Sequence, residues 1–224
     1  MKKADVLIKN AYIITMDHDR NIISNGCIVI DKDKITAVGG GELASCYEAS
    51  RVVDAKGKFV FPGMISTHSH LFQTMLKGLG RDKLLFDWLD SSVRTALHRF
   101  DGEMCYYAAL TGCMEAIQSG TTTLLDYMYC HTSPGLSDYV TQAMEDIGIR
   151  GIYGRGFTNT ANFPPEFKVA HHDTEQDMFD DVRRLYKKYE GHSRMSVALA
   201  PGIIWDNTDD GYREMRKMAD EMHI

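Results

Sequence analysis

Residues 62–70 read Pro-Gly-Met-Ile-Ser-Thr-His-Ser-His, and the interpretation of the whole chain starts from this stretch. The Pro-Gly pair interrupts the preceding pattern, and residues 64–68 predict a short strand. Side chains two residues apart on a strand project to the same side, so we expect His68 and His70 to point together. Two such imidazoles can hold one divalent cation, each through one neutral ring nitrogen. A purely structural histidine pair fits the same pattern.

The residues before this stretch are organised as short strands separated by polar or glycine-rich breaks. β-Branched and aromatic residues mark the strands, and Asp, Asn and Gly mark the breaks. The expected strands are residues 6–8, 12–15, 27–30, 35–38, 52–53 and 59–61. We therefore expect residues 1–61 to form a small antiparallel β domain.

After this stretch, predicted strands alternate with amphipathic helices. The expected strands are residues 64–68, 121–125, 149–153 and 195–200, and the clearest helices are residues 101–120, 136–147, 174–191 and 212–222. This alternation predicts a parallel sheet covered by helices, either an open doubly wound sheet or part of a barrel. The sequence contains neither Gly-x-Gly-x-x-Gly nor a Walker-type loop, which disfavours nucleotide binding of those kinds. Residues 62–224 are thus expected to contain about four β/α units.

The composition excludes several classes of protein. The 224 residues carry 25 Lys and Arg against 31 Asp and Glu, a net charge of −6, so we expect no nucleic-acid partner. Five cysteines without a Cys-x-x-Cys pair disfavour a disulfide scaffold and a zinc ribbon. We read no secretory signal and no membrane span, and expect a cytoplasmic protein without a membrane partner.

Six segments in order along residues 1–200 resemble one family. They are DVLIKNAYIITMD (5–17), IVIDKDKITAVG (28–39), VVDAKGKFVFPGMISTHSHLFQTMLKGL (52–79), FDWL (86–89), EAIQSGTTTLLD (115–126) and VALAP (197–201). Together they resemble the amino-terminal half of the amidohydrolase superfamily, in its chlorohydrolase and aminohydrolase branch. That branch includes guanine, 8-oxoguanine and S-adenosylhomocysteine deaminases and the triazine hydrolases.

The resemblance implies a fold, a cofactor and a reaction. The fold is a distorted (β/α)₈ TIM-like barrel preceded by a small β-sandwich unit. The cofactor is one divalent metal, with zinc the first choice and iron the second, whose first two ligands are His68 and His70. The reaction is hydrolytic removal of an amino group from a compact N-heterocycle or a free nucleobase. A triazine-type chlorohydrolase or alkylaminohydrolase, and a noncatalytic binding module, are the alternatives.

Three residues are candidates for contacts with a small heterocyclic substrate. Gln73 follows the second histidine by three residues, Trp88 could form a wall of the pocket, and Arg155 ends a strand. For each of them a structural role is the competing interpretation. S-adenosylhomocysteine deaminases carry a glutamate near the position of Leu97 and a histidine at that of Gly202, so the resemblance favours a free base over a nucleoside.

The same resemblance implies that part of the site lies outside these residues. Relatives carry further histidine ligands on strands five and six, an aspartate on strand eight and a proton-shuttling glutamate near strand five. We find four barrel strands and therefore name no catalytic acid or base. We expect a truncated or divided enzyme, inactive alone, that associates with the missing carboxyl-terminal half or with a copy of itself as a homo-oligomer.

Overall fold

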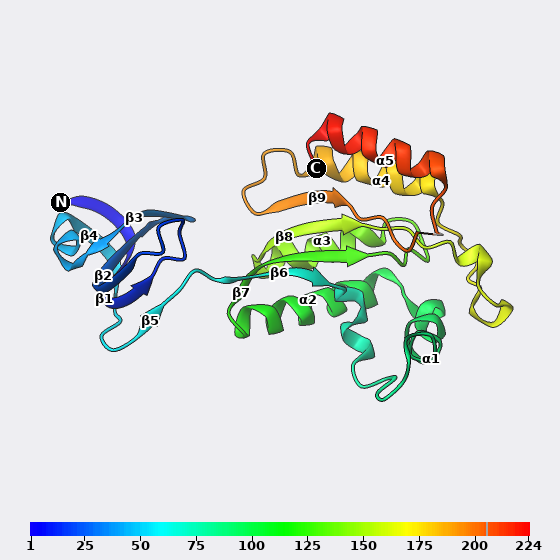
Figure 1. The fold of residues 1–224 in the computed structure, drawn as a ribbon, viewed down its shortest axis with the longest axis horizontal. Helices are drawn as coiled ribbons and strands as arrows, with labels where there is room; N and C mark the ends of the chain where they lie inside the picture. Colours follow the sequence, from blue (N-terminus) through cyan, green and yellow to red (C-terminus); the bar gives the residue numbers. More distant parts are fainter. Residues whose placement is uncertain (205) are drawn as a thin grey trace. The chain divides into compact units, whose positions relative to one another are not determined.

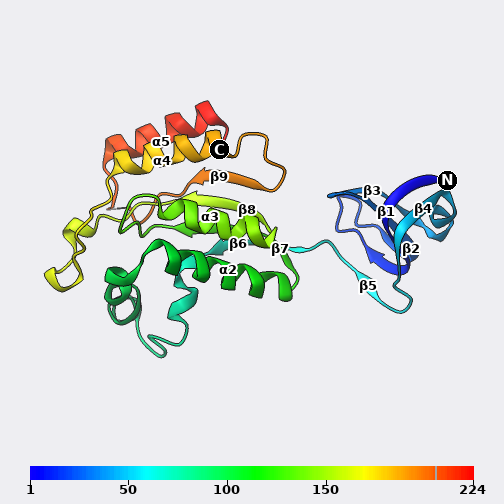
Figure 2. The same cartoon turned by 180° about the vertical axis from the view of Figure 1, so that it is seen from behind.

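The computed structural model describes residues 1–204 and 206–224, which form two compact units, residues 1–63 and 64–224. Figures 1 and 2 show the two units from opposite sides, and each unit is considered by itself. Within the described parts of the chain, no helix is both long and apolar enough to cross a bilayer.

The first unit is one five-stranded sheet. Its strands are β1 (Lys2–Ile14), β2 (Ile22–Asp31), β3 (Lys34–Gly40), β4 (Tyr47–Asp54) and β5 (Phe59–Val60), with a short 3₁₀ helix at Gly41–Cys46. The order is β3-β2-β1-β4, and β5 also pairs with β1. The β1–β2 and β2–β3 pairs are antiparallel, whereas β4 and β5 run parallel to β1.

Two expectations for this unit were wrong in detail. The predicted strands 6–8 and 12–15 belong to a single strand, β1, whose register with β2 shifts on both sides of Ala11. Asn10 adopts φ of 60° there, so the polar break in the sequence marks an irregularity within a strand and not its end. The sheet is mixed and not antiparallel. Its five strands form one hydrogen-bonded sheet, so they do not by themselves supply the two layers of a sandwich.

The second unit is built on a four-stranded parallel sheet in the order β6-β7-β8-β9 (Figure 1). Its strands are β6 (Met64–Ser69), β7 (Thr121–Met128), β8 (Arg150–Arg155) and β9 (Met195–Leu199). Its α-helices are α1 (Leu85–Leu89), α2 (Gly102–Gln118), α3 (Leu136–Ile147), α4 (Glu175–Lys188) and α5 (Asp209–Met222). Short 3₁₀ and π turns lie at Leu71–Leu76, Asp90–Arg94, Leu97–Arg99, Thr160–Asn162 and Pro165–Phe167. The α/β alternation predicted from the sequence is confirmed.

The four expected helices begin and end within three residues of the predicted positions. Asp101 caps α2 by accepting a hydrogen bond from the Met104 N–H at 2.8 Å, and Gly120 turns the chain at φ of 88°. Thr174 and Asp177 form a reciprocal capping box at the start of α4. These local signals fix the helix ends independently of tertiary packing.

The two faces of the parallel sheet differ in burial. On β7, Leu124, Asp126 and Met128 are buried on the face that packs against helices, whereas Leu125 and Tyr127 on the opposite face are only partly buried. Alternate side chains on a strand point to opposite faces, so this pattern distinguishes a helix-covered face from a more open one. The candidate site lies at the carboxyl edge of the open face.

Candidate functional site

His68 and His70 lie side by side at the carboxyl end of β6. His68 belongs to the strand, and His70 follows it as the residue that precedes the turn Leu71–Leu76. The centroids of the two imidazole rings are 4.8 Å apart, and the ring planes are nearly perpendicular at 83°. The alternation of side chains therefore brings both rings to one side, as the sequence pattern predicts, and their role as metal ligands stays a prediction.

The ring of His70 is oriented by the neighbouring strand. Its Nδ1 lies 2.7 Å from the Tyr127 carbonyl oxygen, which can only accept a hydrogen bond. Nδ1 therefore carries the proton in this arrangement, and Nε2 keeps its lone pair. Burial lowers the pKa of His70, and His68 acts in the same direction, while the Tyr127 carbonyl opposes them. A neutral imidazole with one nitrogen held by a carbonyl is the usual form of a metal-binding histidine.

The loop that carries His70 is anchored to β7 by two further hydrogen bonds. The Ser69 hydroxyl donates to the Leu125 carbonyl at 2.7 Å, and the Leu71 N–H donates to Asp126 Oδ1 at 2.7 Å. Asp126 is fully buried on the helix-covered face, and burial raises the pKa of its carboxyl to about 7 against the lowering effect of the Leu71 hydrogen bond. Its other oxygen, Oδ2, has no hydrogen-bond partner among the described residues. Asp126 thus positions the backbone beside His70 without facing the site.

A cavity of about 260 Å³ opens beside the two histidines. Its walls come from the carboxyl ends of all four parallel strands and from the segment around α1: His68, His70, Gln73, Leu85, Trp88, Leu89, Val93, Arg94, Tyr127, Tyr129, Cys130, Thr158, Phe163, Ile203 and Asp206. Most of this lining is apolar or aromatic, with a few polar groups. Such a composition suits a flat, partly apolar ligand that is oriented by a small number of hydrogen bonds.

Gln73 and Trp88, both predicted from the sequence, lie on the wall of this cavity. Gln73 Nε2 donates to the Tyr129 hydroxyl at 2.6 Å. Trp88 packs closely over the turn at Gly80, where a Cβ atom would lie 2.2 Å from Trp88 Cδ1 and φ is 84°. Glycine at that position therefore permits the placement of the indole.

Arg155, the third predicted substrate contact, lies away from this cavity. Its side chain is 3% exposed and forms a bidentate pair with Asp173 at 2.8 and 2.9 Å and a further pair with Asp181 at 2.9 Å. It also donates to His131 Nδ1 at 2.8 Å, while His131 Nε2 lies 3.0 Å from the Tyr153 hydroxyl. Burial lowers the pKa of His131 well below its ordinary value, with Arg155 adding to the effect. The structure places Arg155 in the ion pair that was its competing interpretation.

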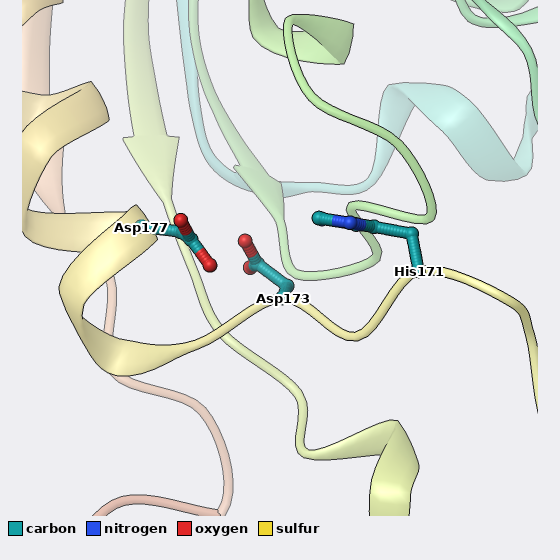
Figure 3. A group of neighbouring side chains, drawn as sticks. All are labelled: His171, Asp173 and Asp177. Atoms are coloured by element: carbon teal, nitrogen blue, oxygen red, sulfur yellow. The ribbon is translucent and has the colours of Figure 1, made fainter.

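Asp173 also belongs to a second group of metal-ligating residue types. Figure 3 shows His171, Asp173 and Asp177, whose potential ligand atoms all lie within 4.8 Å of one another. Both carboxylates already have strong partners, because Asp173 pairs with Arg155 and Asp177 accepts from the Thr174 N–H at 3.0 Å. A cation would have to displace these partners. This group therefore supports a metal site less well than the two histidines of β6.

Sequence reasoning missed several residues that line the cavity. Tyr127 and Tyr129 alternate with buried residues at the end of β7, and this alternation was a usable signal for their common side. Asp206 follows β9 in a loop without a motif, so only the topology reveals it.

The sequence and the fold were compared with known proteins. The sequence model of the amidohydrolase family matches residues 59–224. A 5-methylthioadenosine/S-adenosylhomocysteine deaminase of Bacillus cereus (strain AH820) is 30% identical over 214 residues, which cover 95% of this chain and 46% of the relative. The chain thus spans about half the length of the curated relatives it matches.

Two solved structures illustrate the likeness of the fold. An adenosine deaminase from Xanthomonas campestris with bound zinc superposes with a TM-score of 0.86 at 19% identity, covering 100% of this chain and 48% of the other. A triazine hydrolase from Arthrobacter aurescens gives a TM-score of 0.84 at 22% identity, covering 98% of this chain and 51% of the other. At these identities the likeness concerns the fold alone.

Proposed function

The chain belongs to the amidohydrolase family, and from this membership we propose that it supplies the metal-binding front half of an enzyme that hydrolytically deaminates compact N-heterocycles. In this proposal residues 62–224 form the first four β/α units of a distorted (β/α)₈ barrel, and residues 1–61 contribute to a small β domain. The observation that carries the proposal is the pair of adjacent imidazoles at 4.8 Å on the wall of a cavity.

His68 and His70 are the residues that would hold the metal, which we propose to be zinc, with iron as the second choice. The donor set fits such an ion, because His70 keeps Nε2 available while Nδ1 is bound to the Tyr127 carbonyl. A bound divalent ion would supply the Lewis acidity that lowers the pKa of water toward about 7. Two histidines are fewer than the three protein ligands of a usual catalytic zinc, so further ligands must come from elsewhere.

The remaining cavity residues would bind and orient the substrate. Trp88, Tyr127 and Tyr129 provide aromatic surface against which a flat ring can pack. Gln73 would present its amide to the donor–acceptor edge of the ring, with its rotamer held by the hydrogen bond to Tyr129. These contacts would also exclude water from the reacting carbon. Arg155 has no part in this proposal.

A compact substrate fits the surroundings better than a nucleoside. Leu97 is 1% exposed and packs in the core, so no polar group is available there for ribose hydroxyls. At Gly202 a Cβ atom would lie 2.7 Å from the Phe157 carbonyl oxygen and 2.9 Å from the Tyr127 hydroxyl oxygen. That position therefore has little room for a histidine. We propose that free purine or pyrimidine bases are preferred.

The open face of the parallel sheet must be covered in an active enzyme. Leu125 and Tyr127 on that face are only partly buried. Because apolar sheet surface of this kind is costly to expose to water, we propose that it packs against the carboxyl-terminal half of the barrel or against a second copy of the chain. The further metal ligands and the proton-shuttling glutamate would belong to that part.

Metal content and ammonia release in the complete protein test the function. We expect zinc-loaded protein to release ammonia from free bases faster than from the corresponding nucleosides. His68→Ala and His70→Ala should each lose metal and activity, because each removes one of two adjacent ligands. His18→Ala, at a fully exposed ring, is the matched control. Unchanged metal content in both variants would remove the pair from the site, and turnover of chlorotriazines instead would establish the triazine-hydrolase alternative.

A further inference from the structure

Asp206 lies on the wall of the cavity, in the turn that follows β9. Its backbone N–H donates to the Ile203 carbonyl at 2.8 Å, which closes the turn. The backbone N–H of Asn159, in the loop after β8, lowers the pKa of the Asp206 carboxyl. Asp206 lines the same cavity as His68 and His70.

Among the described residues, the Asp206 carboxylate has no ion-pair partner. Across residues 1–204 and 206–224, no Lys, Arg or His nitrogen lies within the 4.0 Å ion-pair distance of it. Arg94, the basic residue on the same wall, pairs with Asp90 at 2.6 Å and lies over the Phe163 ring at 4.8 Å from its centroid. Burial raises the pKa of Asp206, while the Asn159 hydrogen bond and Arg94 oppose the effect. A half-buried carboxylate without an ion-pair partner among these residues has acceptor capacity for a ligand.

Gly202 lies next to the Tyr127 hydroxyl and the Asp206 carboxylate and places no side chain there. A Cβ atom at Gly202 would lie 2.9 Å from the Tyr127 hydroxyl oxygen and 3.3 Å from Asp206 Oδ2. The first distance is too short for a real Cβ atom, and the second is tight. Glycine at position 202 therefore allows the Tyr127 hydroxyl and the Asp206 carboxylate to occupy their present places next to each other.

Gln73, another polar residue of the cavity, also offers a hydrogen-bond acceptor. One N–H of Gln73 Nε2 is engaged by the Tyr129 hydroxyl, which leaves Oε1 as an acceptor and the second N–H as a donor for a ligand. Gln73 follows β6 and Asp206 follows β9, which are the two outer strands of the sheet. A ring bound across the cavity would therefore meet a hydrogen-bond acceptor on each side.

We propose that Asp206 is a specificity-determining residue that accepts a hydrogen bond from a second exocyclic amino group of the substrate. The inference rests on the proposed function and deepens it, because it names the substrate class. The preferred heterocycles carry an exocyclic amino group besides the one that is removed, as diamino-substituted purines, pyrimidines or triazines do. A charge-assisted hydrogen bond of this kind discriminates by about tenfold or more against a ring that lacks the donor.

Binding of adenine and 2,6-diaminopurine, which differ by one amino group, tests the inference. Dissociation constants are measured by calorimetry on the chelator-treated complete protein, where turnover does not interfere. We expect 2,6-diaminopurine to bind about tenfold more tightly than adenine and this ratio to fall to near one in Asp206→Asn and Asp206→Ala. Asparagine keeps the size of the side chain and removes its charge, and thermal unfolding verifies that both variants fold. Asp210→Asn, at a side chain that is 95% exposed, should keep the ratio.

Two readouts separate this inference from the proposed function. A ratio that persists in both Asp206 variants, or that is near one in the unaltered protein, overturns the role of Asp206. Ammonia release by the zinc-loaded protein reports on deamination independently. If no heterocycle releases ammonia while the Asp206 variants still lose the preference, the deaminase proposal fails and the recognition role stands.

Discussion

Two polar clusters lie near the carboxyl ends of the parallel strands. They differ in how many of their polar atoms are hydrogen-bonded or ion-paired within the cluster. The arginine cluster consists of His131, Arg155, Asp173 and Asp181 on the helix-covered side. In it the guanidinium binds both carboxylates and an imidazole nitrogen. The cavity cluster consists of His68, His70, Gln73 and Asp206. In it His70 Nε2 and the Asp206 carboxylate are left for a ligand.

The difference separates a structural role from a binding role. A buried charge must be paired and hydrogen-bonded, and the arginine cluster achieves this within the chain. In the cavity cluster the fold orients polar atoms but leaves their hydrogen-bonding or metal-binding capacity available to a ligand. Proximity of metal-ligating residue types alone gives the opposite impression, since the ligand atoms of His171, Asp173 and Asp177 all lie within 4.8 Å of one another and, among the described residues, no group of three in the cavity does so. Available lone pairs, more than the number of ligand residues, indicate where a metal or substrate can bind.

The largest effect is expected from breaking the arginine cluster. Arg155→Met keeps an apolar stem but leaves Asp173, whose side chain is 5% exposed, without its cation. Removing one partner of a buried ion pair destabilises a protein by about 3–5 kcal/mol, because the remaining charge is uncompensated. Urea unfolding of the two proteins measures the difference in the free energy of unfolding.

The matched control is Arg213→Met, which removes an exposed pair with Asp210 whose two side chains are 74% and 95% exposed. Exposed pairs of this kind contribute about 0–1 kcal/mol. If Arg155→Met were no more destabilising than this control, the arginine cluster would not be a structural unit, and Arg155 would again be a candidate for substrate binding.

The architecture of the second unit could be predicted from sequence because its signals are local. Asp101, Thr174 and Gly148 lie at helix ends, and short apolar runs lie between the helices, so the four longer helices and the four strands can be predicted without tertiary information. The first unit was harder. Strand pairing is non-local, and the irregularity at Asn10 within β1 resembles a turn when only the sequence is read.

The site could be predicted only in part, for a related reason. His68, His70 and Gln73 lie within six residues, so one strand and one turn bring them together. Asp206 lies in the same cavity because of the order of the strands, and no short sequence motif encodes that order. The sequence predicts a substrate contact at Arg155, but this residue lies away from the cavity. Its place at the end of a strand indicates that it is near the site, but not on which face of the sheet its side chain lies.

An intermediate, pH-dependent effect is expected at Asp126, which anchors the backbone beside His70. The pKa of its carboxyl is raised to about 7 in the folded protein from an ordinary 3.8, because it is fully buried. The folded state therefore holds the proton more tightly than the unfolded state, and this contribution to stability is lost as the pH rises towards the folded pKa. Between pH 5 and 8 the unaltered protein should lose about 2–3 kcal/mol relative to Asp126→Asn.

Urea unfolding at a series of pH values measures this difference, and comparison of the two proteins cancels the titrations that they share. Asparagine retains an oxygen for the Leu71 N–H, so the anchor of the loop is preserved. Asp210→Asn, at a largely exposed side chain, should show a flat difference over the same range. A flat difference for Asp126→Asn as well would mean that its carboxyl is ionised in the folded protein throughout, and that water or a cation compensates it.

The smallest effect is expected at His171. A variant at this position tests directly which of the two groups of residues binds metal. His171→Ala should leave the zinc content of the complete protein unchanged and alter the free energy of unfolding by less than about 0.5 kcal/mol, because the ring is only partly buried. The physical reason is competition. A cation at this position would have to replace Arg155 on Asp173 and the Thr174 N–H on Asp177. Metal analysis beside His70→Ala decides the matter: loss of zinc from His171→Ala, with zinc retained in His70→Ala, would reverse the assignment of the two clusters.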